Sequence, residues 1–600
     1  MEDQHNLGLG INAIKVLERR YLLLDEAGNI DETPARLFRR VARAIAAVET
    51  HFNPEADVNA TEEAFYTMMA GRDFLPNSPT LMNAGTPLGQ LSACFVLPVE
   101  DTIADIFDTL KHMAAIHQSG GGTGFTFTHL RPCGDVVRST NGVASGPVSF
   151  MEIFNTATDV IKQGGKRRGA NMGILRVDHP DILRFIRAKA NGGLTNFNLS
   201  VGVTDEFMEA AAKGKNIPLI NPRNNQQTGP LPARDIFDAI VESAWHTGDP
   251  GMLFLDRINR DNPTPALGPL EATNPCGELP LLPYESCNLG SINLARMVSD
   301  GAIDWEKLGR VVHTAVRFLD NVITANVLPL PAIDEITRAN RKIGLGVMGF
   351  ADALILMGQP YDSGQALETA DALMGFIRNR AQAASARLAA ERKPFPNFPS
   401  SIHASPGEAP LRNASLLSIA PTGTISIIAG CSSGIEPLFA LAYVRNVMEG
   451  TRLMEVHPLF EQIARQQGVW SEALKEKIAR QGTLNGIAGI PENLRRLFAT
   501  DWDIDPAWHI RMQAVFQQHT DNSVSKTINL PAEADAESIR RAYIDAHRQG
   551  CKGITVYRYG SKAGQVLNMP GQEPAGAGPS QYVSVQSAYA GGCASGGCEI

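Results

Sequence analysis

The chain has 600 residues, a net charge of −9, 44% hydrophobic residues and 20% charged residues, a composition typical of a globular protein. Its length exceeds the size at which one hydrophobic core usually stops growing, so we expect several domains or one large enzyme barrel with additions. The acidic balance argues against a nucleic-acid partner, and no apolar run approaches the ~18 residues of a membrane span. We therefore expect no membrane partner and a cytoplasmic location.

Eight cysteines are too few for a disulfide scaffold in a chain of 600 residues. No Cys-x-x-Cys pair occurs and the Cys and His residues form no zinc-like cluster, so we expect no metal site. In a reducing compartment these thiols are either inert core residues or groups for redox chemistry.

The first 75 residues are predicted to be a helical region. Thr33 before Pro34 is typical of a helix N-cap and first turn. Leu37, Val41, Ile45 and Val48 then follow at helical spacing, which predicts a helix with one buried face.

Residues 74–85 contain two prolines and many hydroxyl and amide groups, which favours a polar loop. Residues 90–97 read as a strand carrying Cys94, and residues 101–117 as a helix. A glycine-rich turn follows at 119–124, where the backbone could approach a ligand closely. A second glycine-rich segment, 164–171, carries Lys166, Arg167 and Arg168, and is compatible with phosphate contact or with a mobile solvated loop.

Further along the chain, strand-like and helical segments alternate, which favours an α/β architecture with mostly parallel strands. The predicted strands are 197–203, 416–420, 526–530 and 553–559, and the predicted helices are 204–213, 304–326 and 505–519. At 416–426 a strand runs into small and hydroxylated residues, which indicates either an anion site at a helix start or an ordinary strand-to-helix turn. Gly344, Gly346 and Gly349 fit a dinucleotide-binding pattern, but polar residues precede them where that motif requires a buried strand, so we reject it.

The organising segment is 271–293, where Pro275, Gly277, Pro280 and Pro283 exclude a continuous helix. In extended backbone, Asn274, Cys276 and Glu278 would project to the same side and place an amide, a thiol and a carboxylate together. Cys287 follows eleven residues after Cys276. The alternative is a turn-rich loop with a buried cysteine.

From residue 565 to residue 600 the composition changes to Gly, Pro, Ala, Ser and Gln, which predicts a flexible tail. Such a tail would give Cys593 and Cys598 a reach of roughly 30 Å, enough to visit a site in the same molecule or a neighbouring subunit. The two thiols could shuttle electrons, or they could be incidental.

Together these segments resemble the large catalytic subunit of ribonucleotide reductase, from about residue 10 to the C-terminus. The resemblance rests on Asn274-Pro-Cys-Gly-Glu278, on the segments 77–85, 90–94, 164–171 and 421–426, and on the terminal Cys-x4-Cys. It implies a ten-stranded α/β barrel of two parallel half-sheets at 76–564, with the reactive cysteine on a central loop. The helical region (1–75) precedes this barrel and the flexible tail (565–600) follows it.

The resemblance also implies roles. Cys276 becomes the thiyl radical that removes hydrogen from the ribose 3′ carbon, Glu278 the base on the 3′ hydroxyl, and Asn274 a hydrogen-bond partner of the sugar. Cys94 and Cys287 supply two electrons and form a disulfide. Cys593 and Cys598 then pass electrons from thioredoxin or a similar reductant.

The remaining implied contacts are with nucleotides, and the expected substrates are ribonucleoside diphosphates. Substrate residues are Ser78, Thr80, Ala93, Gly124, Pro421, Thr422, Gly423, Thr424, Ile425 and Ser426. Specificity effectors, deoxynucleotides or ATP, are expected at Asp101, Arg131, Lys166, Arg167 and Arg168. A homodimer is expected.

Residues 555–560 indicate which radical source the protein uses. The oxygen-dependent form passes its radical through adjacent tyrosines, whereas Tyr557 and Tyr559 are separated by Arg558. This arrangement resembles the adenosylcobalamin-dependent form, so adenosylcobalamin is the expected cofactor. The alternatives are an oxygen-dependent enzyme that needs a metal-containing radical subunit, and a catalytically silent nucleotide-binding regulator, which would have little reason to keep Asn274, Cys276 and Glu278.

Overall fold

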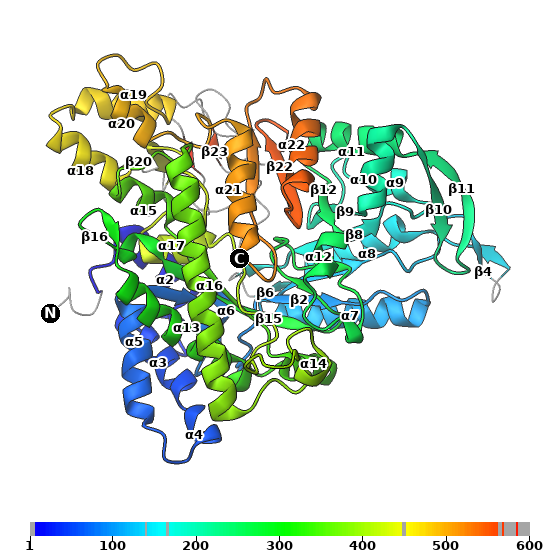
Figure 1. The fold of residues 1–600 in the computed structure, drawn as a ribbon, viewed down its shortest axis with the longest axis horizontal. Coiled ribbons are helices and arrows are strands. Elements are labelled where there is room, and N and C mark those ends of the chain that lie inside the picture. Colours follow the sequence, from blue (N-terminus) through cyan, green and yellow to red (C-terminus); the bar gives the residue numbers. More distant parts are fainter. Residues whose placement is uncertain are drawn as a thin grey trace.

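The computed structural model describes residues 7–137, 141–163, 167–446, 452–561, 567–568 and 584–585. Helices precede the sheet, as expected for the start of the chain (Figure 1). They are α2 (Ile11–Arg20), α3 (Pro34–Ala46), α4 (Glu49–Phe52) and α5 (Val58–Ala70). Thr33 caps α3 by accepting a hydrogen bond from the Arg36 amide at 3.3 Å, and Leu37, Val41 and Ile45 are buried, as predicted. Val48 lies beyond the end of α3, which stops at Ala46.

The centre of the molecule is a ten-stranded mixed sheet. Its first half is parallel throughout. It comprises β2 (Cys94–Leu97), β3 (Gly122–Thr126), β8 (Asn171–Arg176), β9 (Phe197–Val203) and β12 (Gly251–Phe254). At one edge β12 meets β22 (Gly553–Arg558) in antiparallel register, and at the other β2 meets β15 (Ser286–Asn293), also antiparallel.

The second half-sheet is also parallel, and it closes the ring. Strand β15 pairs with β18 (Ile343–Met348), and β21 (Thr527–Leu530) pairs with β22. Between β18 and β21, parallel bridges join Leu345 to Leu417 and Ile419 to Val524, so residues 417–419 fill the remaining position. Two parallel half-sheets, antiparallel to each other at both junctions, therefore form the expected barrel. Strand β1 (Phe74–Pro76) adds to β15 beside β2.

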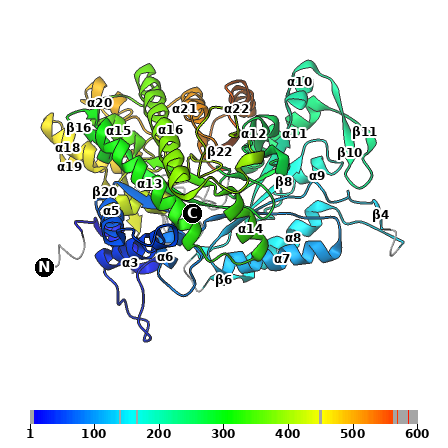
Figure 2. The same ribbon diagram turned by 60° about the horizontal axis from the view of Figure 1, so that its bottom comes forward.

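Helices cover the outside of this barrel, and Figure 2 shows the β10–β11 hairpin and β4 at the end of the molecule far from α3 and α5. The helices are α7 (Ile103–Gln118), α8 (Pro147–Val160), α9 (Ile182–Ile186), α10 (Asp205–Lys213), α11 (Ala233–Thr247), α12 (Leu255–Arg260), α13 (Trp305–Ala325), α14 (Pro331–Asn340), α15 (Phe350–Leu356), α16 (Gly364–Arg392), α17 (Gly423–Ala429), α18 (Pro458–Gln466), α19 (Glu472–Gln481), α20 (Glu492–Leu497), α21 (Pro506–Gln518) and α22 (Ala536–Arg548).

Short strands pair outside the barrel. They are β4 (Val136–Val137) with β5 (Gly142–Val143), β6 (Lys162–Gln163) with β7 (Arg167–Arg168), β10 (Asn216–Asn221) with β11 (Gln226–Pro232), β13 (Ala272–Thr273) with β14 (Pro280–Leu281), and β16 (Val298–Ser299) with β17 (Ala302–Ile303). Strand β19 (Ala442–Asn446) lies between β20 (Arg452–Val456) and β24 (Ser584–Val585), which pairs with β23 (Leu567–Asn568).

The polar loop predicted at 74–85 was wrong. Residues 74–76 form β1, and the expected polar loop after them contains the helix α6 (Ser78–Asn83), because Asn77 caps it and Pro79 lies in its first turn, where proline is tolerated. The region predicted to be a flexible tail includes β23 and β24, whose backbones pair with each other.

A buried ionic network ties the N-terminal helices to the barrel's covering helices. Arg392 on α16 lies 2.7 Å from the Glu49 carboxylate on α4 and 2.9 Å from Asp320 on α13. Its side chain is 1% exposed. The same Asp320 carboxylate lies 2.7 Å from Arg341. Because charges this deeply buried must be paired, removal of one member leaves the others uncompensated.

Candidate active site

The segment 272–281 forms a narrow hairpin that threads the barrel. Its arms are β13 and β14, and both half-sheets hold its backbone. From the first half-sheet, the Asn198 amide donates a hydrogen bond to the Pro275 carbonyl at 2.9 Å. From the second, the Ser418 hydroxyl and the Ser523 amide each donate to the Glu278 carbonyl at 2.9 Å. The hairpin position is thus fixed from opposite walls.

A glycine in β3 makes this threading possible. A β-carbon on Gly124 would lie 1.7 Å from the Thr273 carbonyl oxygen, so only a residue without a side chain allows the hairpin to pass. Gly124, expected to contact substrate, therefore has a clear structural role beside the reactive loop.

The tip of the hairpin is a turn rather than the extended strand that we predicted. The Gly277 amide donates to the Asn274 carbonyl at 3.0 Å, and Gly277 has a φ of +81°. The expected alternation of Asn274, Cys276 and Glu278 is consequently wrong, because the prolines and Gly277 reverse the chain there. Asn274 and Glu278 instead face each other across the neck of the hairpin, and Cys276 lies at its tip.

Asn274 and Glu278 converge on Cys94. The Asn274 side-chain amide donates to the Cys94 sulfur at 3.0 Å, and the Cys94 thiol lies 4.0 Å from Glu278 Oε1. Asn274 is itself held because its side-chain oxygen accepts from the Leu279 amide at 3.0 Å. An amide, a carboxyl and a thiol therefore share one buried site, as the sequence predicted for the first two.

The carboxyl group of Glu278 is suited to proton transfer. Burial raises its pKa to about 7, because the low-dielectric surroundings disfavour the charged form. Its Oε2 atom is buried and has no hydrogen-bond partner among the described residues. A carboxyl group with such a pKa and a spare oxygen can accept a proton near neutral pH.

Cys94 and Cys287 face each other where the two half-sheets meet. They are directly paired residues of antiparallel strands β2 and β15 and are both buried. Paired positions in antiparallel strands bring α-carbons to about 4.5 to 5.5 Å, within the range that a disulfide spans. Burial and the nearby Glu285 carboxylate raise the pKa of the Cys287 thiol far above its usual range. Both residues are present as thiols.

Cys276 is more accessible than the other two thiols. It lines a small cavity of about 40 Å³ together with residues of β9, β12, β21 and β22. Ser200, Gly251, Lys526 and Thr555 are among the lining residues. The cavity gives an approach to the sulfur from the walls that include β12 and β22, where the half-sheets meet at their other junction.

The predicted substrate residues surround the same barrel. Ala93 precedes Cys94, and its carbonyl accepts a hydrogen bond from Gly122 of β3. On α6, the Thr80 hydroxyl donates to the Leu91 carbonyl at 3.0 Å and the Ser78 hydroxyl lies 2.7 Å from that of Tyr21.

Residues 421–426 directly follow the bridged strand that contacts Glu278, and they start α17 as predicted. Thr422, with a φ of +59°, precedes the helix, and its hydroxyl accepts from the Gly434 amide at 2.7 Å. The segment comprises Pro421, Thr422, Gly423, Thr424, Ile425 and Ser426, all buried.

The structure joins two of the five expected effector residues, Asp101 and Arg131, next to the start of α7. Arg131 Nε lies 2.7 Å from Asp101 Oδ2, and the Arg131 amide donates to Asp101 Oδ1 at 3.0 Å. Arg167 and Arg168 form β7, whose backbone is described. Lys166, Cys593 and Cys598 lie outside the described residues.

Sequence reasoning missed several residues that hold the reactive hairpin. Asn198 and Ser418 lie in predicted strands, and each bonds the hairpin through its side chain. Ser523 precedes β21 and bonds the hairpin through its backbone amide. The side chains of Asn198 and Ser418 within apolar strands are a usable signal, because a polar side chain in a buried strand must find a partner.

Comparison with known proteins agrees with this geometry. The family model "Ribonucleotide reductase, barrel domain" matches residues 92–557, and "Ribonucleotide reductase, all-alpha domain" matches residues 7–89. The chain belongs to the ribonucleotide reductase family.

Among its relatives are two proteins named vitamin B12-dependent ribonucleoside-diphosphate reductase. That of Thermoplasma acidophilum is 49% identical, with 99% of this chain and 86% of the relative covered. That of Mycobacterium tuberculosis (strain CDC 1551 / Oshkosh) is 50% identical, covering 99% and 85%. The class Id ribonucleotide reductase α subunit of Actinobacillus ureae shares the fold, with a TM-score of 0.76, 23% identity, and coverage of 92% of this chain and 97% of that one.

Proposed function

We propose that this protein reduces ribonucleoside diphosphates to 2′-deoxyribonucleotides by a thiyl-radical mechanism, with adenosylcobalamin as the radical source. The observation that carries the proposal is the reactive hairpin, which brings Asn274, Glu278 and Cys94 into one buried site and holds Cys276 at its tip. The names of the relatives described above support the substrate class and the cofactor.

Each residue of the site has its own role in the reaction. The Cys276 sulfur, as a radical, takes the 3′ hydrogen atom of the ribose, while Glu278 accepts the 3′ hydroxyl proton through its spare oxygen. Asn274 holds the sugar hydroxyls. The 2′ hydroxyl leaves as water, and Cys94 and Cys287 lose two electrons and two protons as they form a disulfide. Cys276 then returns the hydrogen atom to the 3′ carbon.

When bound, adenosylcobalamin supplies the hydrogen-abstracting radical that oxidises Cys276. The fit is tested by the cavity at Cys276, which is lined partly by the small residues Gly248, Ser200 and Gly251. Cys276 is the one cysteine of the three in this site that is not fully buried, so its sulfur can be approached from this wall. The separation of Tyr557 from Tyr559 supports the same choice, because it removes an adjacent-tyrosine relay.

The other nucleotide and protein partners follow from the same proposal. Substrate phosphates bind at residues 421–426, and effectors bind near Asp101 and Arg131. A homodimer forms through α7 and α8, whose outer faces expose Ile103 (63%), Phe107 (48%), Ile153 (39%) and Val160 (77%). Covering this apolar surface would stabilise a dimer and place the effector residues beside the interface.

Electrons reach the internal disulfide through Cys593 and Cys598 from thioredoxin or a similar protein. A protein reductant cannot enter a site where both thiols are fully buried, so a carrier on the chain is needed. Because this chemistry requires reduced thiols, we place the enzyme in the cytoplasm. Among the described residues, no helix has the length and apolarity to span a membrane.

The test is anaerobic reduction of CDP with adenosylcobalamin and dithiothreitol. We expect turnover by the parent protein and none by Cys276→Ser, because a serine O–H bond is too strong for the radical exchange. The exposed cysteine variant Cys133→Ser is the matched control and should retain the parental rate. Normal turnover by Cys276→Ser would refute the mechanism. Activity only with an added ferritin-like subunit would refute the cofactor assignment.

A further inference from the structure

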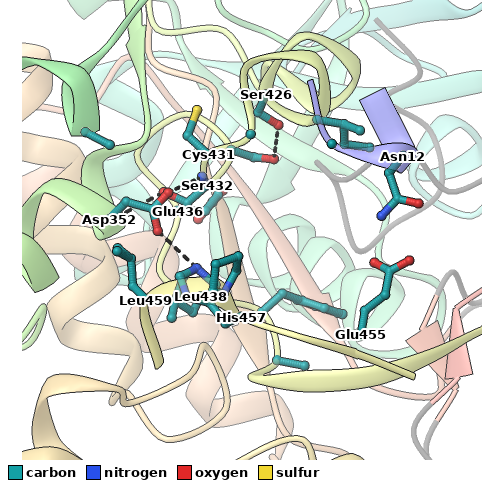
Figure 3. Close-up of a pocket in the computed structure, with 18 of the residues that line it drawn as sticks. Asn12, Asp352, Ser426, Cys431, Ser432, Glu436, Leu438, Glu455, His457 and Leu459 are labelled. Atoms are coloured by element: carbon teal, nitrogen blue, oxygen red, sulfur yellow. Dashed lines mark hydrogen bonds and ion pairs between the residues drawn. The ribbon is translucent and has the colours of Figure 1, made fainter. Parts of the chain in front are cut away.

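A large cavity of about 630 Å³ lies at the carboxyl ends of the second half-sheet (Figure 3). Ala295 after β15, Asp352 after β18 and Ser426 after the bridged strand line it, together with Thr527 and Asn529 of β21. Much of the remaining wall is apolar and includes Ile428, Leu438, Phe439, Val456 and Leu459. Ligands of α/β sheets commonly bind at this end of the strands.

Most charged groups in the cavity wall are already paired. Glu436 accepts hydrogen bonds from Lys526 and from the Thr527 amide. Asp352 accepts from the Ser432 amide at 2.7 Å and lies 3.0 Å from His457, as Figure 3 shows. Each of these two carboxylates therefore already accepts at least one hydrogen bond.

Asp501 and Asn529 differ from them. Asp501 is 2% exposed and Asn529 is 7% exposed, and both line the cavity. Neither oxygen of Asp501, nor the side-chain oxygen of Asn529, has a hydrogen-bond partner among the described residues. His509 Nδ1 lies 3.7 Å from Asp501 Oδ1, which is too far for a hydrogen bond. Leaving a buried polar atom unpaired costs about 1 to 3 kcal/mol, so such atoms indicate a ligand or ordered water.

The protonation of Asp501 defines what would pair with it. Burial raises its pKa to about 8, so at neutral pH it is mainly a carboxylic acid, with one hydrogen-bond donor beside one acceptor. The complementary partner is a planar group that also presents a donor next to an acceptor. A primary carboxamide has this arrangement, and so does the amino edge of adenine.

The cavity is also close to the reactive cysteine. Thr527 lines both this cavity and the small cavity at Cys276. Lys526 lines the small cavity and donates a hydrogen bond to Glu436, which lines the large one. The residues at the start of β21 thus form a wall between the two spaces.

We infer that this cavity binds a planar donor–acceptor edge of the cofactor, either a carboxamide of the corrin or the adenine of the adenosyl group, through Asp501 and Asn529. The inference rests on the proposed function, since that function supplies a cofactor carrying both groups. A phosphate is disfavoured, because four acidic side chains line the cavity, Asp352, Glu436, Glu455 and Asp501, against one arginine, Arg72.

A divalent cation is the competing occupant. Donor atoms of Glu436, Asp501 and His509 lie within 4.8 Å of one another. The Lys526 ammonium, however, already occupies the Glu436 carboxylate, and a second cation beside it would be repelled. If a cation were the occupant, these three groups would bind Mn²⁺ or Zn²⁺.

The experiment measures binding of two separate probes to the full chain by equilibrium dialysis. Dicyanocobinamide carries the carboxamides without adenosine, and adenosine carries the adenine edge alone. We expect one of them to bind the parent protein, to lose at least tenfold in affinity in Asp501→Leu, and to be retained within about threefold in Asp501→Asn, because an asparagine also presents a donor beside an acceptor. Glu461→Gln, a change of a partly exposed residue on nearby α18, is the control and should bind normally.

Each result decides the inference. Loss of cobinamide binding identifies the corrin carboxamides, and loss of adenosine binding identifies adenine. Leu438→Trp should block the same probe by filling the cavity, which keeps the test valid if Asp501→Leu unfolds. Unchanged affinities in Asp501→Leu and Leu438→Trp overturn the inference, as does Mn²⁺ or Zn²⁺ binding that both Asp501 variants abolish. CDP turnover of the parent protein tests the proposed function separately, so failure of either is distinguishable.

Discussion

Glu278→Gln should abolish turnover and yet stabilise the protein in a pH-dependent way. The pKa of the buried carboxyl rises from 4.5 to about 7 on folding, so the native state binds its proton more tightly than the unfolded state does. Stability contributed by this protonated form is present at low pH. It is lost as the pH rises from 4.5 towards 7, because only the unfolded state releases the proton in that window.

The magnitude follows from the same two values. At about 1.4 kcal/mol per tenfold change, the ionisable carboxyl costs the native state about 1 kcal/mol at pH 5 and about 3 kcal/mol at pH 8. Glutamine has nearly the same shape and does not ionise, so Glu278→Gln avoids this cost. The free energy of unfolding should therefore rise relative to the parent by about 1 kcal/mol at pH 5 and about 3 kcal/mol at pH 8, as upper estimates.

Urea unfolding of reduced protein at the two pH values measures this difference, with Glu533→Gln, an exposed position, as the control. CDP reduction is measured in parallel, and for the parent protein it should increase as the pH rises through about 7. Equal effects of Glu278→Gln at pH 5 and pH 8 would refute the shifted pKa. Retained turnover would refute the role of this carboxyl as the base.

Three further changes have defined outcomes. Gly124→Ala should displace the reactive hairpin and reduce CDP turnover at least 100-fold. Gly364→Ala is the control and should retain turnover, because a β-carbon there would meet open space. Parental activity in Gly124→Ala would contradict the close approach of Gly124 to the Thr273 carbonyl. Arg392→Ala should lower the free energy of unfolding by about 3 to 5 kcal/mol in urea titrations, and a loss below about 1 kcal/mol would contradict the buried network. Cys593→Ser or Cys598→Ser should stop multiple turnover with thioredoxin but not with dithiothreitol; parental rates with thioredoxin would exclude the shuttle.

Much of the fold could be predicted where local signals are strong. Strand β9 lies at the predicted residues, and α10 (Asp205–Lys213) lies within the predicted helix 204–213, with Thr204 as its N-cap. The strand predicted at 416–420 was located correctly, but its neighbours in the barrel could not be predicted, because its bridges reach Leu345 and Val524, far away in sequence. Helix α6 was missed because its proline suggested a loop, although proline in a first helical turn costs little.

For the candidate site, the residues could be predicted from the sequence but their arrangement could not. Asn274, Cys276 and Glu278 could be selected from spacing and residue type, since they are neighbours in the chain. Their actual arrangement depends on a turn at Gly277 and on Cys94, which arrives from another strand. The partnerless oxygens of Glu278 and Asp501 could not be foreseen, because burial and pairing are properties of the packed molecule.

The position of Cys94 and Cys287 at the junction of the half-sheets has a mechanical consequence. The disulfide that we propose would fasten the two halves of the barrel covalently and close a chain loop of roughly 190 residues. By the loop-entropy relation, such a cross-link restricts the unfolded chain by about 5 kcal/mol. The form with reduced Cys94 and Cys287 and the form with the disulfide would then differ in resistance to heat and proteases. The disulfide form would be the more resistant until it is reduced again.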